Sequence, residues 1–395
     1  MASERWDIFC RVVDNLGDVG VSWRLARQVA REHGKRVRLW LDDLTVLHKL
    51  RPDLDPAYDL QAIDGVEVAR LSEPFVVDAI ADVVVETFGC DPPEPYVLAM
   101  AARSSKPRWI NLEYLSAETW VEESHALPSP HPRLPLVKHY FFPGFTPRTG
   151  GLLREAGLLE RRDDFQGDRG AQAAFWTSLV GKVPPRDALK VSLFSYAGAP
   201  LEGLARASAQ YPGPVWLVAA EGAAGHALRA WGEAARGSLR RNDHSGGGRR
   251  EVEVLQIPFL SQERYDQLLW ACDINFVRGE DSFVRAQWAA RPFAWHIYPT
   301  DDGAHWIKMA AFLARYTETL DRTHAATVTA LWEAWNRGDE PVPDDKAKTA
   351  LNEAWPAFTA RRERLQEHAK AWSERLATRA DIAAALVDFT DNVLK

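Results

Sequence analysis

Short apolar segments recur along this chain of 395 residues, and each is followed by a longer segment whose apolar residues have helical spacing. Residues 5–13, RWDIFCRVV, are apolar on both faces, which is typical of a central strand in a parallel sheet. Residues 19–34 repeat apolar side chains every four positions and end in glycine, as an α-helix does. Residues 36–43, RVRLWLDD, indicate a second strand. This alternation predicts an α/β fold with helices on both faces of a mainly parallel sheet.

A second series of the same kind occupies the C-terminal half of the chain. Its predicted strands are residues 189–196, 213–222, 252–260, 272–279 and 292–299. A segment rich in proline, aromatic and charged residues, about 128–168, separates the two series. Because one hydrophobic core seldom grows to the size of this chain, we expect two domains. We place an N-terminal Rossmann-like domain at 1–180 and a C-terminal one at 185–365, with a helix at about 370–395 that packs back on the first.

The charge balance and the apolar pattern exclude some classes of partner. The chain has 48 Lys and Arg against 55 Asp and Glu, a net charge of −7, which disfavours broad binding to nucleic acid or to anionic membranes. It has no apolar run long enough to span a bilayer, and its first residues do not resemble a signal peptide. The three cysteines are isolated in apolar segments, which is typical of buried thiols in a reducing compartment. We therefore expect a cytoplasmic protein.

Several motifs that bind metals or nucleotides are missing from the sequence. The eleven histidines show neither HxxxH nor HExxH spacing, so the sequence predicts no metal site. The dinucleotide-binding GxGxxG, the phosphate-binding GxxxxGK[ST] and the GxSxG of serine hydrolases are also absent. The chemistry has to be sought in less familiar patterns.

The segment INFVRGEDSFVRAQWAA holds the clearest candidate site in the C-terminal half. The predicted strand ends at Arg278, and we expect a helix to begin near Phe283 with Asp281 or Ser282 as its N-cap. A helix N-terminus at the carboxyl edge of a parallel sheet is suited to phosphate, so Arg278 could neutralise a diphosphate and Glu280 could bind ribose hydroxyls. Plain helix capping with a solvated Arg and Glu explains the same pattern.

Aromatic residues end two other predicted strands of this half. They are Phe194, Tyr196, Phe259 and Tyr265. Aromatic rings at this edge could stack on a nucleobase and pack against a sugar. A place in the hydrophobic core explains each of them equally well.

The stretch DNLGDVG raises the main question about the N-terminal half. Asp14 and Asp18 stand on either side of a glycine turn, between the first predicted strand and the first predicted helix. Asp18 could simply cap that helix. Alternatively it could act as a general base, with Asp14 as its partner, because a helix N-terminus keeps a carboxylate ionised. The residues alone leave both interpretations open.

Taken together, several motifs are similar to those of one family. DIFCRVVDNLGDVGVSWRLARQ, VVETFGCDPPE, WINLEYLSAE, PFLSQERYDQLL and RGEDSFVRAQWA followed by PFAWHIYP resemble the bacterial arginine rhamnosyltransferases of elongation factor P (EF-P), the EarP family. The resemblance spans nearly the whole chain in one order. It implies a GT-B glycosyltransferase fold, with two Rossmann-like domains facing across a cleft. It also implies inverting transfer of rhamnose from dTDP-β-L-rhamnose to an arginine of EF-P, which supports translation of polyproline stretches, without a metal cofactor.

The resemblance also assigns roles to individual residues. Asp18 matches the proposed general base of the family, and Asp14 matches its acidic neighbour. The positions that match the donor site are Phe194, Tyr196, Phe259, Arg278, Glu280, Asp281 and Ser282, with Gln256 and Tyr298 as further donor contacts. Glu280 is in addition a candidate catalytic residue. The chain departs from the family at Leu16 and Val19, both apolar changes, and residues 225–250 find no match.

Two other functions remain open on the residues. A nucleotide-sugar epimerase or hydrolase could use the same two-domain plan without a protein acceptor. A non-catalytic nucleotide-binding module would not need acidic residues near its ligand.

Overall fold

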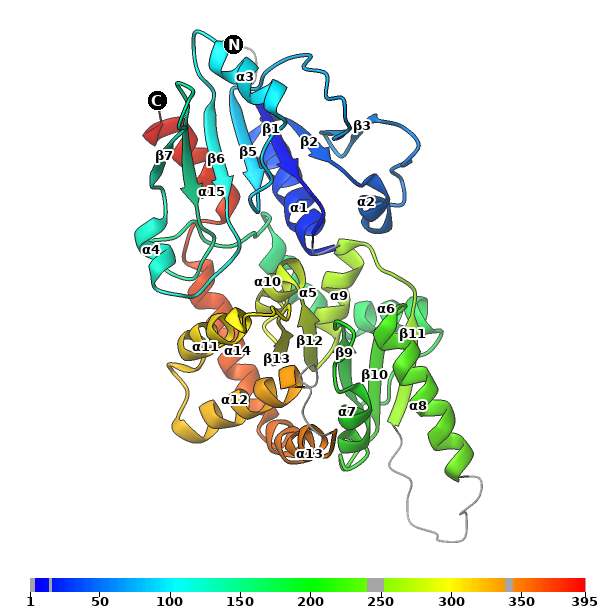
Figure 1. The fold of residues 1–395 in the computed structure, drawn as a ribbon. Helices are drawn as coiled ribbons and strands as arrows, with labels where there is room; N and C mark the ends of the chain where they lie inside the picture. The colour runs from blue at the N-terminus through cyan, green and yellow to red at the C-terminus, as the bar shows by residue number, and fades with distance from the viewer. Residues whose placement is uncertain (1–3, 14–15, 240–251, 338–343, 395) are drawn as a thin grey trace. The chain divides into compact units, whose positions relative to one another are not determined.

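The computed structural model describes residues 4–13, 16–239, 252–337 and 344–394 and divides into two compact units (Figure 1). The N-terminal unit comprises Met1–Leu158 and Arg375–Lys395, and the C-terminal unit comprises Leu159–Glu374. The boundary that the sequence suggested near residue 180 falls at the end of a helix inside the C-terminal unit.

The N-terminal unit is built on a sheet of eight strands with the order β3-β4-β2-β1-β5-β6-β8-β7. The strands are β1 (Arg5–Cys10), β2 (Arg36–Leu41), β3 (Leu60–Ile63), β4 (Val66–Arg70), β5 (Val83–Thr87), β6 (Arg108–Leu112), β7 (Pro128–Pro130) and β8 (Val137–Phe141). The six strands from β4 to β8 in this order are parallel, whereas β3 and β7 pair antiparallel at the two edges. The apolar segments of the first half therefore form the predicted parallel sheet.

Helices cover both faces of this sheet. They are α1 (Leu16–His33), α2 (Leu44–Leu50), α3 (Glu94–Ala102), α4 (Trp120–Ser124) and α15 (Ile382–Asp388), with a π-helix at Phe389–Val393. On one face Phe9 and Trp109 of the strands pack with Tyr96 and Met100 of α3. On α1, the Gln28 amide nitrogen donates to Asp381 at 2.9 Å, which holds the C-terminal segment in the N-terminal unit.

The C-terminal unit has a sheet of five parallel strands with the order β11-β10-β9-β12-β13. The strands are β9 (Leu189–Leu193), β10 (Val215–Ala220), β11 (Val252–Ile257), β12 (Ile274–Arg278) and β13 (Phe293–His296). Numbered along the chain this is the order 3-2-1-4-5, that of a Rossmann half. All five lie within the strands predicted from the sequence, so these predictions are confirmed.

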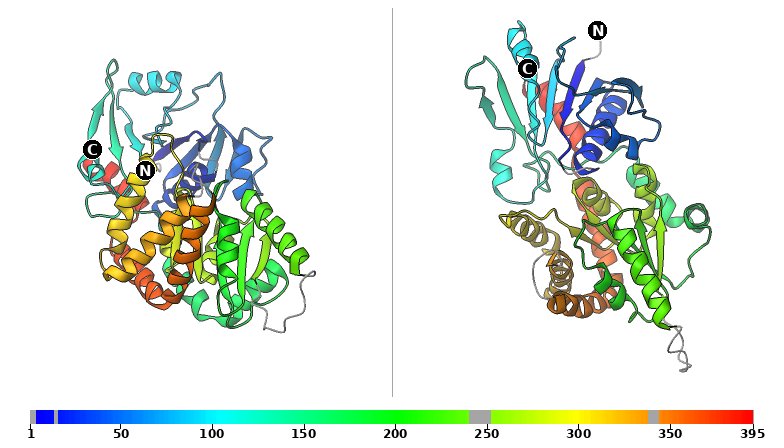
Figure 2. Two further views of the ribbon diagram at one scale, coloured as in Figure 1. Left: turned by 60° about the horizontal axis from the view of Figure 1, so that its bottom comes forward. Right: turned by 45° about the vertical axis from the view of Figure 1, so that its right-hand side comes forward.

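The helices of this unit lie around the five-stranded sheet, some against its strands and others against neighbouring helices (Figure 2). They are α5 (Leu158–Gly167), α6 (Arg169–Val180), α7 (Leu201–Ser208), α8 (Ala223–Leu239), α9 (Gln262–Ala271), α10 (Glu280–Trp288), α11 (Ala304–Thr317), α12 (Arg322–Asn336), α13 (Asp344–Ala360) and α14 (Arg362–Ala377). Aromatic rings fill the core, as in the stack of Phe283 on Trp295 with ring centroids 4.0 Å apart. Among the described residues no helix is both long and apolar enough to cross a membrane.

Candidate functional site

The C-terminal unit places the end of β9 beside the end of β12, where the strand order reverses. In doubly wound sheets ligands bind at this point, outside the carboxyl ends of the strands. The backbone N–H of Phe194 donates to the carbonyl of Phe276 at 3.0 Å, and this is where the chain leaves β9. Arg278 is the last residue of β12. The residues predicted from sequence for this edge are therefore neighbours.

The side chain of Arg278 packs against two aromatic rings. Its guanidinium carbon lies 4.6 Å from the ring centroid of Phe194 and 4.6 Å from that of Tyr196. Such contacts hold the planar cation by its faces, and its N–H groups lie along the edge of that plane. Guanidinium N–H groups in this fork geometry suit a diphosphate. We call Phe194, Tyr196 and Arg278 the arginine clamp.

The turn between β12 and α10 differs from the sequence-based expectation. The helix begins at Glu280 with Gly279 as the N-cap, so the expected start near Phe283 and the expected caps Asp281 and Ser282 are wrong. Gly279 has φ 58°, a left-handed conformation that glycine adopts easily, and this allows the helix to start three residues earlier. The Trp295 indole donates to the carbonyl of Gly279 at 3.0 Å. Glycine has no side chain with which to cap the first N–H groups of α10, so these suit an anion.

Each of the three residues that follow Gly279 has a neighbouring partner. Glu280 forms an ion pair with Lys308 of α11, with 3.3 Å between the carboxylate oxygen and Nζ. Asp281 accepts a hydrogen bond from the side-chain amide of Gln262 at 3.1 Å. Ser282 Oγ accepts from the Arg278 N–H at 3.0 Å and donates to the Arg278 carbonyl. The turn is thus fixed by its own side chains.

The remaining predicted donor residues lie along the same sheet edge or beside it. Tyr298 is 52% exposed and its ring meets that of Tyr196 edge-on, with centroids 5.3 Å apart. Tyr265 meets Phe194 at 5.8 Å, and burial raises the pKa of its hydroxyl. Phe259 is half-buried in the segment between β11 and α9. The structure brings Tyr298 and Tyr265 to the arginine clamp.

Among the described residues, several buried polar atoms near this edge have no hydrogen-bond partner, and two of them matter for the donor. They are Oγ of Ser195, which lies between the two aromatic residues of the clamp, and Oε1 of Gln256 in β11. A side chain at Gly225 would come within 2.6 Å of the Ala220 carbonyl and 3.1 Å of the Gln256 amide nitrogen, so α8 lies close to Gln256. An unpaired buried polar atom destabilises the protein, so a ligand that supplied a partner to either oxygen would offset that cost.

The N-terminal unit carries Asp18 at its own reversal of strand order, between β1 and β5. Asp18 lies in the first turn of α1 and is 2% exposed. Its Oδ2 accepts a hydrogen bond from the backbone N–H of Val13 at 2.9 Å. The carboxylate therefore sits inside the helix start rather than at the capping position, next to the positive end of the helix dipole. Asp14 lies outside the described residues.

Hydrogen bonds fix α1 to the strands around Asp18. The hydroxyls of Ser22 and Thr87 are 3.2 Å apart, and Thr87 donates to the carbonyl of Phe9 at 3.0 Å. Burial raises the pKa of the Cys10 thiol to about 12, so this cysteine stays neutral. At the ends of β5 and β6 the rings of Phe88 and Tyr114 stack with centroids 4.5 Å apart. Neither ring was among the residues predicted for the site from the sequence.

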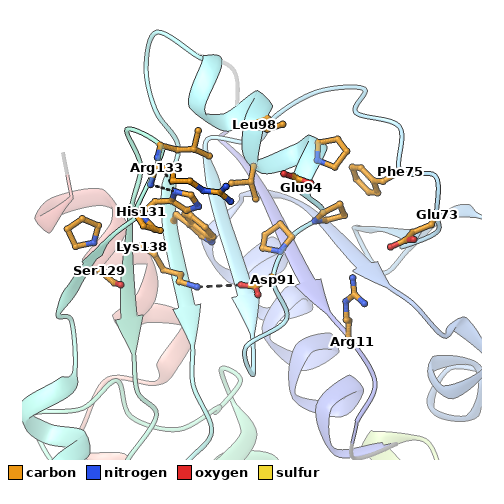
Figure 3. Close-up of a pocket in the computed structure, with 18 of the residues that line it drawn as sticks. Arg11, Glu73, Phe75, Asp91, Glu94, Leu98, Ser129, His131, Arg133 and Lys138 are labelled. Atoms are coloured by element: carbon orange, nitrogen blue, oxygen red, sulfur yellow. Dashed lines mark hydrogen bonds and ion pairs between the residues drawn. The ribbon is translucent and has the colours of Figure 1, made fainter.

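A groove of about 1040 Å³ lies on the α3 side of the N-terminal sheet (Figure 3). Six prolines and the rings of Phe75, Trp109 and Tyr140 line it, and charge comes from Arg11, Glu73, Asp91, Glu94, Arg133 and Lys138. Lys138 pairs with Glu86 at 2.5 Å and with Asp91 at 3.6 Å. Burial raises the pKa of Glu86 to about 7, although Lys138 opposes this shift. The groove is assembled from separate segments, so no sequence motif indicated it.

No group of three or more His, Cys, Asp and Glu side chains within the described part of the chain is arranged to hold a metal ion. The groups of the C-terminal unit that suit a diphosphate are the guanidinium of Arg278 and the first backbone N–H groups of α10.

Comparison with known proteins gives one consistent family. The sequence model described as "Elongation-Factor P (EF-P) rhamnosyltransferase EarP" matches residues 6–391. The protein-arginine rhamnosyltransferase of Pseudomonas putida is 47% identical over 98% of this chain and 99% of that protein. The protein of the same name from Pseudomonas aeruginosa is 43% identical over 97% of this chain and 98% of that protein.

Solved structures agree with this result. One described as "Structural basis for EarP-mediated arginine glycosylation of translation elongation factor EF-P" is 35% identical, with a TM-score of 0.65 and 99% of both chains covered. A glycosyltransferase from Rickettsia africae has a TM-score of 0.52 at 7% identity over 100% of both chains, a likeness in fold alone. These likenesses and the two Rossmann-like units confirm the predicted GT-B class of fold.

Proposed function

We infer that this chain, which belongs to the EarP family of EF-P rhamnosyltransferases, transfers rhamnose from dTDP-β-L-rhamnose to one arginine side chain of EF-P. The match over residues 6–391 and the 47% identity to a protein-arginine rhamnosyltransferase support this function. The chain is a glycosyltransferase, and its family uses a nucleotide sugar as donor. Our proposal adds that the nucleotide is dTDP, that the transfer inverts the anomeric carbon, and that the enzyme works in the cytoplasm, where a translation factor acts.

The arginine clamp is the observation that carries the donor assignment. We propose that Arg278 and the first N–H groups of α10 bind the diphosphate, because both lie where β12 ends, beside the reversal point of the sheet. Ser195 and Gln256 have buried oxygen atoms that a nucleoside could satisfy. Phe194, Tyr196, Phe259 and Tyr298 could pack against the base and the sugars, and Glu280, Asp281 and Ser282 shape the turn beside them.

Asp18 is proposed as the general base. In the reaction a guanidinium nitrogen forms a bond to the anomeric carbon while the bond from that carbon to the diphosphate oxygen breaks. The nitrogen gives up a proton, which Asp18 accepts, and dTDP leaves with its charge held by Arg278 and α10. A guanidinium is a poor nucleophile because its pKa lies above about 12, so a nearby carboxylate both attracts the cation and removes its proton.

We propose that Asp14 orients the guanidinium beside Asp18. The N-terminal unit is accordingly the acceptor-binding part of the enzyme, and the C-terminal unit is the donor-binding part. An acidic residue held at the start of α1 suits a cationic acceptor, just as a basic residue at the end of β12 suits an anionic donor.

Incubation with dTDP-β-L-rhamnose, with and without EF-P, tests this proposal. Mass spectrometry of EF-P should show one added rhamnose on an arginine only when enzyme, donor and acceptor are all present. Release of free sugar at the same rate without EF-P would indicate a hydrolase, and isomerised donor would indicate an epimerase. Donor binding without any turnover would indicate a non-catalytic module.

We also propose that the transfer needs no metal ion. Arg278 and the α10 N–H groups can balance the charge of the leaving diphosphate. The rate of rhamnosyl transfer should therefore be unchanged by EDTA. Loss of activity that Mg²⁺ or Mn²⁺ restores would contradict this part of the proposal.

A further inference from the structure

A backbone hydrogen bond beyond the strand ladder anchors the segment that follows β9. The N–H of Phe194 makes the last bond of the ladder, to Phe276. Two residues later, the backbone N–H of Tyr196 donates to Nδ1 of His296 at 3.2 Å. His296 is the last residue of β13 and is 0% exposed. A fully buried imidazole thus fixes the backbone at the base of the arginine clamp.

The backbone around His296 is itself firmly held. Asn336 of α12 accepts from the N–H of Ile297 at 3.0 Å and donates to the carbonyl of Trp295 at 2.8 Å. The ring of Trp335 lies 5.9 Å from the imidazole. Because both flanking peptide groups are bonded to α12, His296 offers its acceptor nitrogen from a fixed position.

His296 also lies beside Arg278 in the sheet. The two residues are register partners in the parallel pair of β12 and β13. The ring of Tyr196 is 5.5 Å from the imidazole, and its centroid is 4.6 Å from the guanidinium carbon of Arg278. The hydrogen bond from the Tyr196 N–H to His296 therefore fixes the position of the Tyr196 ring relative to Arg278.

We propose that His296 is a positioning residue of the donor site. Its unprotonated Nδ1 accepts the Tyr196 N–H, keeps the Tyr196 ring against Arg278, and so orients the guanidinium toward the diphosphate. His296 itself does not contact the donor. This inference rests on the proposed function, because it needs the arginine clamp to bind a nucleoside diphosphate.

Two substitutions distinguish the effect of the hydrogen-bond acceptor Nδ1 from the effect of the aromatic ring of His296. His296→Phe keeps a buried ring but has no acceptor, whereas His296→Asn places an amide oxygen close to the position of Nδ1. Titration calorimetry with dTDP, which needs no acceptor protein, should show about a fivefold to tenfold weaker Kd for His296→Phe, the loss of one oriented hydrogen bond. His296→Asn should stay within about threefold of the unaltered protein. In rhamnosyl transfer His296→Phe should raise the donor KM by the same factor and leave kcat within about twofold.

Several outcomes would overturn the inference. One is a His296→Phe protein that binds dTDP as the unaltered protein does. Another is an equal loss in both variants, and a third is a fall in kcat with an unchanged KM. If the unaltered protein neither binds dTDP nor transfers rhamnose, the proposed function fails and this inference fails with it.

A measurement on the unaltered protein covers the case in which His296→Phe does not fold. Nitrogen-15 spectra of the imidazoles, with the signal of His296 assigned by its loss in His296→Asn, report which ring nitrogen carries the proton. A bare Nδ1 and a protonated Nε2 at neutral pH support the proposal. A proton on Nδ1 would overturn it.

Discussion

The two units share one strand order and differ in the charge that stands at its reversal point. The N-terminal unit contains β4-β2-β1-β5-β6 and the C-terminal unit β11-β10-β9-β12-β13, so both turn back beside their first strand. At that point the first unit has the carboxylate of Asp18, and the second has the guanidinium of Arg278. The fold supplies the place, and the residues there decide which charge it binds. We propose that the first edge binds the cationic acceptor and the second binds the anionic donor.

The largest effect should come from removing the charge at the N-terminal edge. Asp18→Asn keeps an oxygen that can accept the Val13 N–H, but it loses the carboxylate that we propose as the base. We expect kcat for rhamnosyl transfer to fall about a thousandfold with the donor KM nearly unchanged. Steady-state kinetics measures both, and Asp43→Asn, at the cap of α2 in the same unit, is the matched control. Wild-type kcat in Asp18→Asn together with loss in Asp14→Asn would reverse the assignment of the two acids.

Removing the positive charge of Arg278 at the C-terminal edge should weaken donor binding. Arg278→Met keeps the length of the side chain and removes its charge and donors. The donor KM should rise about a hundredfold, because a charged hydrogen-bonded contact to the diphosphate is lost. Arg264 of the same unit also packs on an aromatic ring, 4.7 Å from the centroid of Phe175, so Arg264→Met is the control and should leave KM unchanged. Equal effects of the two substitutions would show that Arg278 acts only through packing.

The stability of the protein should depend on pH through Glu86 of the N-terminal unit. Burial raises the pKa of Glu86 to about 7, against 4.5 for the free side chain. An acid with a raised pKa in the folded state contributes stability that is present below its unfolded pKa and is lost as pH rises toward the folded one. Urea unfolding should show the protein less stable at pH 7 than at pH 5 by on the order of 2 kcal/mol relative to Glu86→Gln. An identical pH dependence in the two proteins would contradict the raised pKa.

The smallest effect should follow from loosening the turn at the C-terminal edge. Lys308→Met removes the cation that pairs with Glu280 and leaves the rest of α11 intact. We expect the donor KM to rise about threefold to fivefold, in line with one partly exposed ion pair. Lys308→Arg should restore most of the affinity. An unchanged KM in Lys308→Met would mean that Glu280 is placed by its position in the helix alone.

Much of the fold could be predicted from the sequence because strands that are buried on both faces have continuous apolar sequences. Residues 189–196 and 272–279 were read correctly as the strands that contain β9 and β12, and the edge that their ends share follows from the Rossmann order. The start of α10 was not accessible. A helix that begins directly after Gly279 depends on the left-handed backbone of that glycine, and the acidic and serine residues after it resemble ordinary caps.

The parts of the site that the sequence did not reveal all depend on register or on distant segments. His296 meets Arg278 only because β12 and β13 pair in one alignment. Lys308 reaches Glu280 from another helix, and Asn336 reaches β13 from a third. The groove of the N-terminal unit joins segments as far apart as Arg11 and Tyr140. None of these contacts leaves a local pattern in the chain.

Because of the arginine clamp, the Arg278 side chain loses its conformational entropy during folding and not when the donor binds. A free arginine samples many rotamers, and restricting them costs about 2 kcal/mol. Here Phe194 and Tyr196 already restrict Arg278 in the protein without ligand, so that cost belongs to folding rather than to donor binding. A donor that meets an ordered cation keeps more of its interaction energy as affinity. The two rings thus make the ordering of Arg278 part of folding, so its entropy cost lowers the stability of the fold and not the affinity for the donor.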